Sequence, residues 1–197
     1  MIQNLIKQIY QPTGRKVEFN GKSTVYNLGS GKQDFPGVTA VDWVDSPNVK
    51  IKHDLDVFPW PIPDNSADAI LAFHYIEHTN ELFKVFNEIN RIGKNGCKVL
   101  IEVPHFRASS AFKDPTHKHF FTAKTIQYFC RNNHTYTDLP FKFKLVDISI
   151  GWPADNSKNP IKKWIKKWLK SHLDFYDNFL YMFLHSKILV VELEIIK

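Results

Sequence analysis

The chain has 197 residues, 43% of them hydrophobic, and a formal net charge of +6. This length fits one domain with a substantial core, so we treat residues 1–197 as a single domain. No stretch reaches the ~18 apolar residues that cross a bilayer, and no secretion signal is visible, so we expect a cytoplasmic protein. The two cysteines, Cys97 and Cys130, are too few for a disulfide framework or a cysteine zinc site.

The apolar pattern predicts seven short strands in chain order, each bounded by glycine, proline or polar turn residues. They are expected at residues 23–29, 37–43, 49–55, 67–74, 97–104, 141–152 and 186–197. Helices are expected at 79–93, capped by Thr79 or Asn80, and at 122–132, capped by Thr122. In the first helix, one face carries Leu82, Phe83, Phe86 and Ile89. Strands separated by connectors and helices indicate an α/β fold with a mainly parallel sheet.

A glycine turn and two acids follow the first three predicted strands. Gly29 and Gly31 follow the first strand, Asp42 ends the second and Asp54 ends the third. The carboxyl ends of parallel strands share one sheet edge, where open α/β sheets bind ligands. Glycine lets a ligand approach the backbone, and the carboxylates can accept from ribose hydroxyls and from an exocyclic amine. The alternative is three ordinary turns at strand ends.

The length of the glycine turn restricts the kind of ligand. Only KQDFP separates Gly31 from Gly37, which is too short for a crossover helix. A dinucleotide needs a long helix whose N-terminus faces its pyrophosphate. The turn therefore disfavours NAD and favours a nucleotide-like cofactor without a pyrophosphate.

Several motifs together carry a family resemblance across residues 25–129. They are VYNLGSGKQDFPGVTAVDW, HDL, P-x-P-D-N-S-x-D, EH, and KNG before the fifth strand. Their combination resembles the class I S-adenosylmethionine-dependent methyltransferases, and most closely the type 11 group. The resemblance implies a Rossmann-like α/β fold, with a mainly parallel sheet of seven strands, helices on both faces and an antiparallel last strand.

The resemblance also implies the cofactor, S-adenosyl-L-methionine, and its contacts. It places the methionine part at the glycine turn, the ribose at Asp42, and the adenine at Asp54 and Leu55. Asn27 stands where the family usually has an acid, and the helix after the turn is reduced to KQDFP. The residues expected to bind the cofactor are Asn27, Leu28, Gly29, Ser30, Gly31, Asp42, Trp43, Asp54, Leu55 and His74.

Four histidines follow the fourth and fifth strands and are the candidate catalytic residues: His74, His78, His105 and His117. The resemblance implies methyl transfer to a small-molecule or glycan acceptor, and we expect a hydroxyl oxygen, whose proton needs a base such as histidine. The histidines and Glu77 can equally serve structural hydrogen bonds. A metal site formed by His74, His78, His105 and His117 is a further alternative, because imidazole with carboxylate suits several divalent ions. No HExxH-type spacing is present, so no metal is expected. A non-catalytic cofactor-binding or regulatory protein of the same fold is the alternative function.

The segment 151–185, between the last two strands, is expected to be a helical lid insertion. Within it, IKKWIKKWLK at 161–170 places apolar residues at helical spacing and five lysines on the other face. This pattern is typical of a lid helix with its apolar face on the domain, and also of a helix lying on an anionic membrane or near a lipid-linked substrate. The second reading makes the protein peripheral to the membrane. No nucleic-acid partner is expected, because the aromatic residues do not alternate with the lysines across a binding surface.

Overall fold

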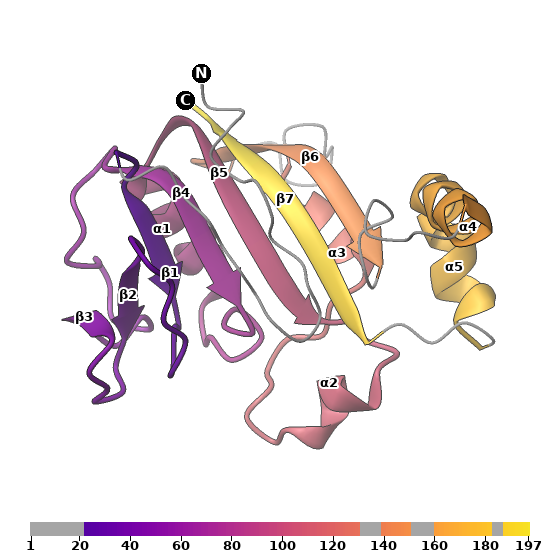
Figure 1. Ribbon diagram of the computed structural model, residues 1–197, viewed down its shortest axis with the longest axis horizontal. Coiled ribbons are helices and arrows are strands. Elements are labelled where there is room, and N and C mark those ends of the chain that lie inside the picture. Colours follow the sequence, from indigo (N-terminus) through magenta and orange to yellow (C-terminus); the bar gives the residue numbers. More distant parts are fainter. Residues whose placement is uncertain (1–21, 131–138, 151–159, 183–186) are drawn as a thin grey trace.

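The computed structural model describes residues 22–130, 139–150, 160–182 and 187–197. Seven strands form one sheet in the order β3-β2-β1-β4-β5-β7-β6, as Figure 1 shows. The strands are β1 (Val25–Leu28), β2 (Thr39–Asp42), β3 (Val49–Lys52), β4 (Ala67–Phe73), β5 (Gly93–Pro104), β6 (Lys142–Ile150) and β7 (Ile188–Ile196).

The strand directions confirm the predicted topology. Strand β1 pairs in parallel with both β2 and β4, and β4 pairs in parallel with β5. Strand β7 lies antiparallel between β5 and β6. The chain runs from β1 outward to β3 and then returns to β4 on the other side of β1, so the strand order switches between β1 and β4. In open α/β sheets, ligands bind outside the carboxyl ends of the strands at such a switch.

The connection from β1 to β2 contains no helix, as the short spacing predicts. Phe35 in this connection is buried and contacts the edge of the Phe73 ring, with ring centroids 6.2 Å apart. A small apolar cluster on one sheet face joins Phe35 to residues of four strands: Val25 of β1, Ala69, Leu71 and Phe73 of β4, Leu100 of β5 and Val190 of β7. One aromatic side chain thus covers sheet surface that a crossover helix would otherwise cover.

Helices α1 (Leu82–Ile92) and α3 (Ala123–Gln127) pack on the opposite face, behind the sheet in Figure 1. The large apolar cluster lies here, and Phe86 stacks on Phe129 with ring centroids 3.9 Å apart. The expected stripe on α1 is partly wrong: Phe83 is 44% exposed, and the buried residues are Val85, Phe86, Glu88, Ile89 and Ile92. Among the described ranges, the helices that pack on the sheet share this one face, so the expected cover on both faces is not seen there.

The N-terminus of α1 differs from the expectation because its predicted caps have another partner. The helix begins after Glu81, which makes no side-chain cap. Thr79 Oγ1 and Asn80 Nδ2 instead donate to the Asp56 carboxylate, at 2.5 and 2.6 Å. The cap on α3 is as predicted, since Thr122 accepts from two backbone N–H groups of the first turn.

Strand β5 begins earlier than predicted, at Gly93, directly after α1. Gly93 pairs with Ala67 of β4, and the register shifts between Ala67 and Ala69, which accommodates the KNG turn within the strand. Gly96 adopts a φ of +80°, in the left-handed region that favours glycine. The turn residues that suggested a break therefore form an irregularity inside β5. After β5 comes a short helix that the sequence did not suggest, α2 (Ser109–Lys113).

Helices α4 (Pro160–Ser171) and α5 (Leu173–Asn178) and the 3-10 turn η2 (Leu180–Met182) lie beyond the β6 edge in Figure 1. Lys124 of α3 pairs with Asp174 of α5 at 2.8 Å. The predicted helix at 161–170 is confirmed, but the expected packing of its apolar face on the domain is wrong for Ile161 and Trp164, which are 67% and 66% exposed.

Candidate active site

The glycine turn follows β1 at the switch in strand order. Gly29 has a φ of +62° and Gly31 a φ of +54°, backbone conformations that residues with a Cβ rarely adopt. A Cβ on Gly29 would lie 2.7 Å from Tyr75 Cβ, whereas nothing lies within 4 Å of a Cβ on Gly31. Gly29 therefore permits close packing against the chain that follows β4, and the space beside Gly31 is open to a ligand.

Asp42 ends β2 and is tied to the glycine turn. Its Oδ2 accepts from the Gly31 backbone N–H at 2.7 Å, and its Oδ1 accepts from the Val44 N–H at 2.9 Å. The side chain is buried. A carboxylate has about four acceptor positions, so two remain after these bonds. The turn thus holds a fixed carboxylate that can still accept from two hydroxyl groups.

Two buried polar atoms, one at the end of β1 and one in the turn, have no hydrogen-bond partner among the described residues: Asn27 Oδ1 and Ser30 Oγ. Asn27 Nδ2 donates to Gln33 Oε1 at 3.3 Å, which leaves its amide oxygen as an available acceptor. Buried polar groups are nearly always paired, so unpaired ones indicate a missing ligand or water. An amide oxygen and a hydroxyl suit the ammonium and carboxylate of an amino acid, and the turn therefore fits the methionine part of S-adenosylmethionine.

The remaining cofactor candidates are spread along the same edge. Strand β3 ends at Lys52, so Asp54 lies in the loop beyond it, exposed, and accepts from the Asp56 N–H at 3.0 Å. The expectation that Asp54 ends the strand is wrong by two residues. Leu28 and Leu55 are buried, and Trp43 is 71% exposed.

His74 follows β4 and is held between two carboxylates. Its φ is +53°, a left-handed conformation that is uncommon outside glycine and often occurs at functional sites. Nδ1 lies 3.1 Å from Glu77 Oε1, and Nε2 lies 3.2 Å from Glu102 Oε1. Burial lowers the pKa of His74, but the hydrogen bonds to Glu102 and Glu77 outweigh this effect and raise the pKa to about 9. The ring is therefore an imidazolium at neutral pH.

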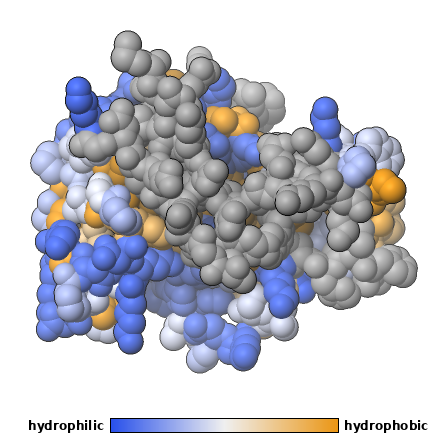
Figure 2. Space-filling model, viewed as in Figure 1, coloured by the Kyte–Doolittle hydropathy of each residue, from blue (hydrophilic) through white to orange (hydrophobic). Residues whose placement is uncertain are grey.

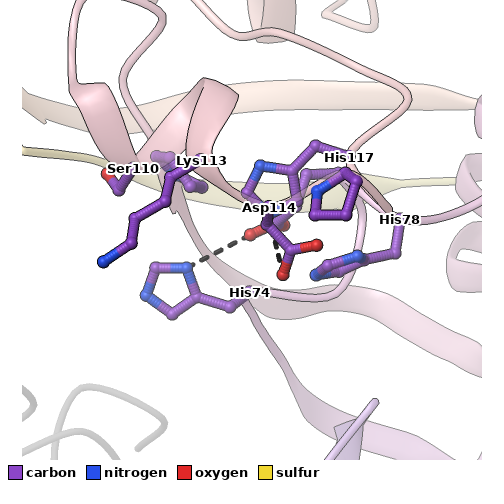
Figure 3. Close-up of a pocket in the computed structure, with 9 residues that line it drawn as sticks. His74, His78, Ser110, Lys113, Asp114 and His117 are labelled. Carbon is purple, nitrogen blue, oxygen red and sulfur yellow. Dashed lines mark hydrogen bonds and ion pairs between the residues drawn. The ribbon is translucent and has the colours of Figure 1, made fainter.

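A cavity of about 520 Å³ opens beside His74 at the carboxyl ends of β4 and β5. Figure 3 shows His74, His78, His117 and Asp114 gathered around it from two loops. The lining residues are His74, Glu77, His78, Pro104, Ser110, Lys113, Asp114, Pro115 and His117. None of the described residues of the expected lid lines this cavity.

Two of the lining histidines have defined tautomers. His117 Nδ1 lies 2.8 Å from the Ala111 carbonyl, which only accepts, so Nδ1 carries the proton. Thr116 Oγ1 donates to Asp114 Oδ1 at 2.7 Å, and it therefore accepts from His78 Nδ1 at 2.8 Å. Both rings are thus assigned a proton on Nδ1 from these partners, and His117 Nε2 lies 4.0 Å from Asp114 Oδ2. Three of the four predicted catalytic histidines meet here.

His105 is the exception. Its ring is fully buried, Nε2 lies 2.9 Å from Asp177 Oδ1 of α5, and Nδ1 accepts from the Arg107 N–H. His105 also contacts the Tyr176 ring edge-on. It therefore joins the end of β5 to α5 and does not reach the cavity.

Sequence reasoning missed three residues that shape this site: Tyr75, Glu102 and Thr116. Tyr75 packs against Gly29, and burial raises its pKa above the usual range, with a further rise from the nearby Asp56 carboxylate. Glu102 fixes His74, and Thr116 fixes His78. Position beside a recognised histidine, in FHYIEH, EVPH and DPTH, is the one signal that could have found them.

Part of the chain matches a known protein family. Residues 38–101, less than half of the chain, match the family model described as Methyltransferase domain. Over these residues the chain is similar to that family. Its predicted resemblance to the type 11 group is confirmed over these residues, which contain β2, β3, β4, α1 and most of β5. No curated protein matches the chain in sequence.

Solved structures confirm the predicted Rossmann-like fold. A SAM-dependent methyltransferase from Archaeoglobus fulgidus is similar at a TM-score of 0.56 and 15% identity, covering 87% of this chain and 86% of that one. The YcgJ protein from Bacillus subtilis is similar at a TM-score of 0.55 and 13% identity, covering 90% and 93%. The [4+2]-cyclase SpnF is also similar, at a TM-score of 0.52 and 14% identity, covering 89% and 75%. At these identities the likeness establishes the fold.

The family match supports S-adenosylmethionine as the cofactor and a methyltransferase as the enzyme class. The structure agrees with this assignment at the turn, where a fixed carboxylate and two unpartnered buried polar atoms adjoin an open glycine. The cofactor edge and the histidine cavity are neighbours, because Gly29 contacts Tyr75 and Tyr75 follows His74.

Proposed function

We propose that this protein transfers a methyl group from S-adenosylmethionine to a hydroxyl oxygen of a small-molecule or glycan acceptor bound in the histidine cavity. The observation that carries the proposal is the pair of imidazoles, His78 and His117, which line a cavity beside the glycine turn with their Nδ1–H groups bound to protein acceptors. Transfer to oxygen needs a group that draws away the hydroxyl proton, and an imidazole with an unprotonated nitrogen can do so.

The turn and strand ends hold the cofactor in this proposal. Asn27 and Ser30 bind the amino acid end with their unpartnered atoms, and Asp42 accepts from the ribose hydroxyls. When bound, S-adenosylmethionine supplies a sulfonium methyl group, which the acceptor oxygen takes with its lone pair while the electrons of the C–S bond stay on sulfur. Holding the two reactants in line contributes most of the acceleration in such a transfer.

The cavity residues have different roles in binding and activating the acceptor. His74 is a cation at neutral pH, so it donates hydrogen bonds and does not accept the proton. In the neutral form of each ring, Nε2 of His78 and His117 accepts the hydroxyl proton, because Nδ1–H is bound to Thr116 or Ala111. Lys113 and Ser110, from α2, line the opposite part of the cavity and can bind other polar groups of the acceptor.

A screen of hydroxylated acceptors, scored by formation of S-adenosylhomocysteine, tests this proposal. With a productive acceptor, His117→Ala should lower kcat by about a hundredfold or more while the affinity for S-adenosylmethionine stays within twofold. His172→Ala, a histidine at the α4–α5 junction, is the matched control and should keep full activity. Loss of activity only in proportion to lost thermal stability would contradict the role of His117.

We also propose that α4 rests on an anionic membrane surface, which would place the active site near lipid-linked or membrane-bound acceptors. Exposed apolar side chains gather on the α4–α5 unit, and Figure 2 shows hydrophobic atoms at this end of the molecule. They are Ile161, Trp164, Ile165, Phe175 and Phe179. Their combination with a lysine-rich sequence suits the headgroup region of an anionic bilayer. No helix in the described ranges is long and apolar enough to span a membrane.

Vesicle flotation tests the membrane contact. Binding to phosphatidylglycerol vesicles should exceed binding to phosphatidylcholine vesicles and should weaken as salt rises, because each lysine near the surface contributes about 1 kcal/mol. Replacing Lys162, Lys163, Lys166 and Lys167 by Gln should abolish binding. The control removes the same charge elsewhere, at Lys22, Lys50, Lys84 and Lys142, and should still bind. Equal binding of both variants, or a dimer formed through α4 without vesicle binding, would overturn the proposal.

A further inference from the structure

The strongest unassigned feature is a set of three metal-ligand side chains on the cavity wall. One ligand atom from each of Glu77, His78 and His117 lies within 4.8 Å of the other two. The sequence disfavoured a metal because no HExxH-type spacing is present, but these residues come from two loops that the fold brings together. We propose that Glu77, His78 and His117 bind a divalent transition-metal ion, with Zn²⁺ as the best match, and leave one coordination position open to the cavity.

The carboxylate of Glu77 is buried and has one oxygen available to bind a cation. Glu77 is 1% exposed, and its Oε2 is buried without a hydrogen-bond partner among the described residues. Its Oε1 is already occupied by His74 Nδ1 at 3.1 Å. Leaving a buried carboxylate oxygen unpaired is costly, and a bound cation would remove that cost. This arrangement matches ligating carboxylates in general, whose second oxygen is hydrogen-bonded to a supporting residue.

Hydrogen bonds also fix the orientation of the two imidazole rings. His117 donates its Nδ1–H to the Ala111 carbonyl, and His78 donates its Nδ1–H to Thr116, which is held in turn by Asp114. Metal-ligating histidines almost always donate the other ring N–H to such a partner, which fixes the tautomer and aims the lone pair. The two rings meet edge to face with centroids 4.7 Å apart, so both lie on the same part of the cavity wall.

The two loops are joined by bonds that do not involve the ligands' side chains. The backbone N–H groups of Lys118 and His119 donate to the Glu77 carbonyl, at 2.8 and 3.2 Å. His119 Nε2 donates to the Thr79 carbonyl at 2.9 Å. The positions of the ligand residues are thus fixed by the backbone before any ion binds, as a specific site requires.

The ligand types identify the class of ion. Two histidines and one carboxylate form the ligand set of catalytic zinc sites with an open fourth position, and imidazole also suits iron, nickel and copper. Ligands at about 2.1 Å from a tetrahedral ion lie about 3.4 Å apart, so ligand atoms that lie within 4.8 Å of one another must approach by up to about 1.4 Å on binding. His78 and Glu77 are adjacent in a loop, which allows such a change without moving a strand.

The metal site changes the role proposed above for His78 and His117. With the ion bound, the free ring nitrogen of each histidine is a ligand, and the ion, in place of the imidazoles, promotes loss of the hydroxyl proton. An acceptor hydroxyl in the open position loses its proton more readily, because a cation lowers the pKa of a bound oxygen acid. The proton leaves to solvent at the exposed rim beside Asp114, and the alkoxide oxygen remains as the nucleophile. This role rests on the proposed methyl transfer, whereas binding of the ion depends only on the three side chains.

Titration of the chelator-treated protein tests the site, in the absence of S-adenosylmethionine. Calorimetry with ZnCl₂ should show saturable binding of one ion per chain, and CoCl₂ should give the strong visible absorption of four-coordinate cobalt. Glu77→Gln and His117→Ala should each weaken Zn²⁺ binding at least about tenfold. His172→Ala is the matched control and should bind Zn²⁺ within twofold of the unmodified protein.

The Zn²⁺ titration needs a control for folding of the variants. Thermal unfolding without metal identifies any variant that fails to fold, and Glu77→Gln, which keeps the side-chain shape, then carries the test. Absence of saturable binding, or binding that survives in both ligand variants, would overturn the site. Because no cofactor is present, failure here leaves the methyltransferase proposal standing, and failure to bind S-adenosylmethionine leaves the metal site standing.

Discussion

Gly29→Ala tests the close approach of the glycine turn to the chain after β4. The new Cβ would lie 2.7 Å from Tyr75 Cβ, 2.8 Å from Cγ and 2.9 Å from Cδ2. Carbon atoms normally stay about 3.5–4.0 Å apart, so the turn or the tyrosine must shift by about 1 Å. Overpacking of this kind costs about 1–3 kcal/mol. The left-handed φ of +62° adds about 1–2 kcal/mol for a residue with a Cβ.

Gly31→Ala separates these two costs. Its φ of +54° brings a similar conformational cost, but nothing lies within 4 Å of the new Cβ. We therefore expect Gly29→Ala to lower the free energy of unfolding by about 2–5 kcal/mol and Gly31→Ala by about 1–2 kcal/mol. Urea unfolding of both variants, read by far-UV circular dichroism, measures the difference. Equal losses would refute the packing of Gly29 against Tyr75.

Two further predictions concern residues that support the site. His105→Ala should lower the free energy of unfolding by about 2–3 kcal/mol, because it leaves the Asp177 carboxylate without its buried partner, while affinity for S-adenosylmethionine stays within twofold. Calorimetry alongside urea unfolding checks both parts, and unchanged stability would contradict the structural role. Arg91→Lys should lower the free energy of unfolding by about 1–2 kcal/mol. The Arg91 guanidinium binds the carboxylates of Glu88 and Asp64 and two backbone carbonyls, and a single ammonium cannot replace all of these bonds. A melting temperature equal to that of the unmodified protein would show this prediction to be wrong.

Local sequence predicted the strands well because each is a short apolar run with clear turn residues at its ends. The order of strands around β1 could be expected only through the family resemblance, since pairing is a long-range property. The absence of a crossover helix after Gly31 could be predicted from the sequence alone, because five residues are too few to form one. The caps of α1 were missed because Thr79 and Asn80 bind Asp56, which lies more than 20 residues earlier in the chain.

The histidines show where local reasoning stops. His74, His78, His105 and His117 all follow predicted strands, but His105 turns to Asp177, which is 72 positions away. His78 and His117 meet because backbone bonds join their loops, and no spacing rule encodes that contact.

The amphipathic pattern of α4 likewise predicted a helix and its apolar residues. The pattern could not predict what covers those residues, and Ile161 and Trp164 are in fact exposed.

Isothermal titration calorimetry of the full chain measures binding of S-adenosylmethionine directly. We expect saturable binding of one molecule of S-adenosylmethionine, and of S-adenosylhomocysteine, per chain. Asp42→Asn removes a carboxylate acceptor from the ribose site and should weaken both by about 1.5–3 kcal/mol, roughly 10- to 150-fold. Absence of saturable binding in a protein that unfolds cooperatively, or equal affinity in the Asp42→Asn variant, would contradict the account.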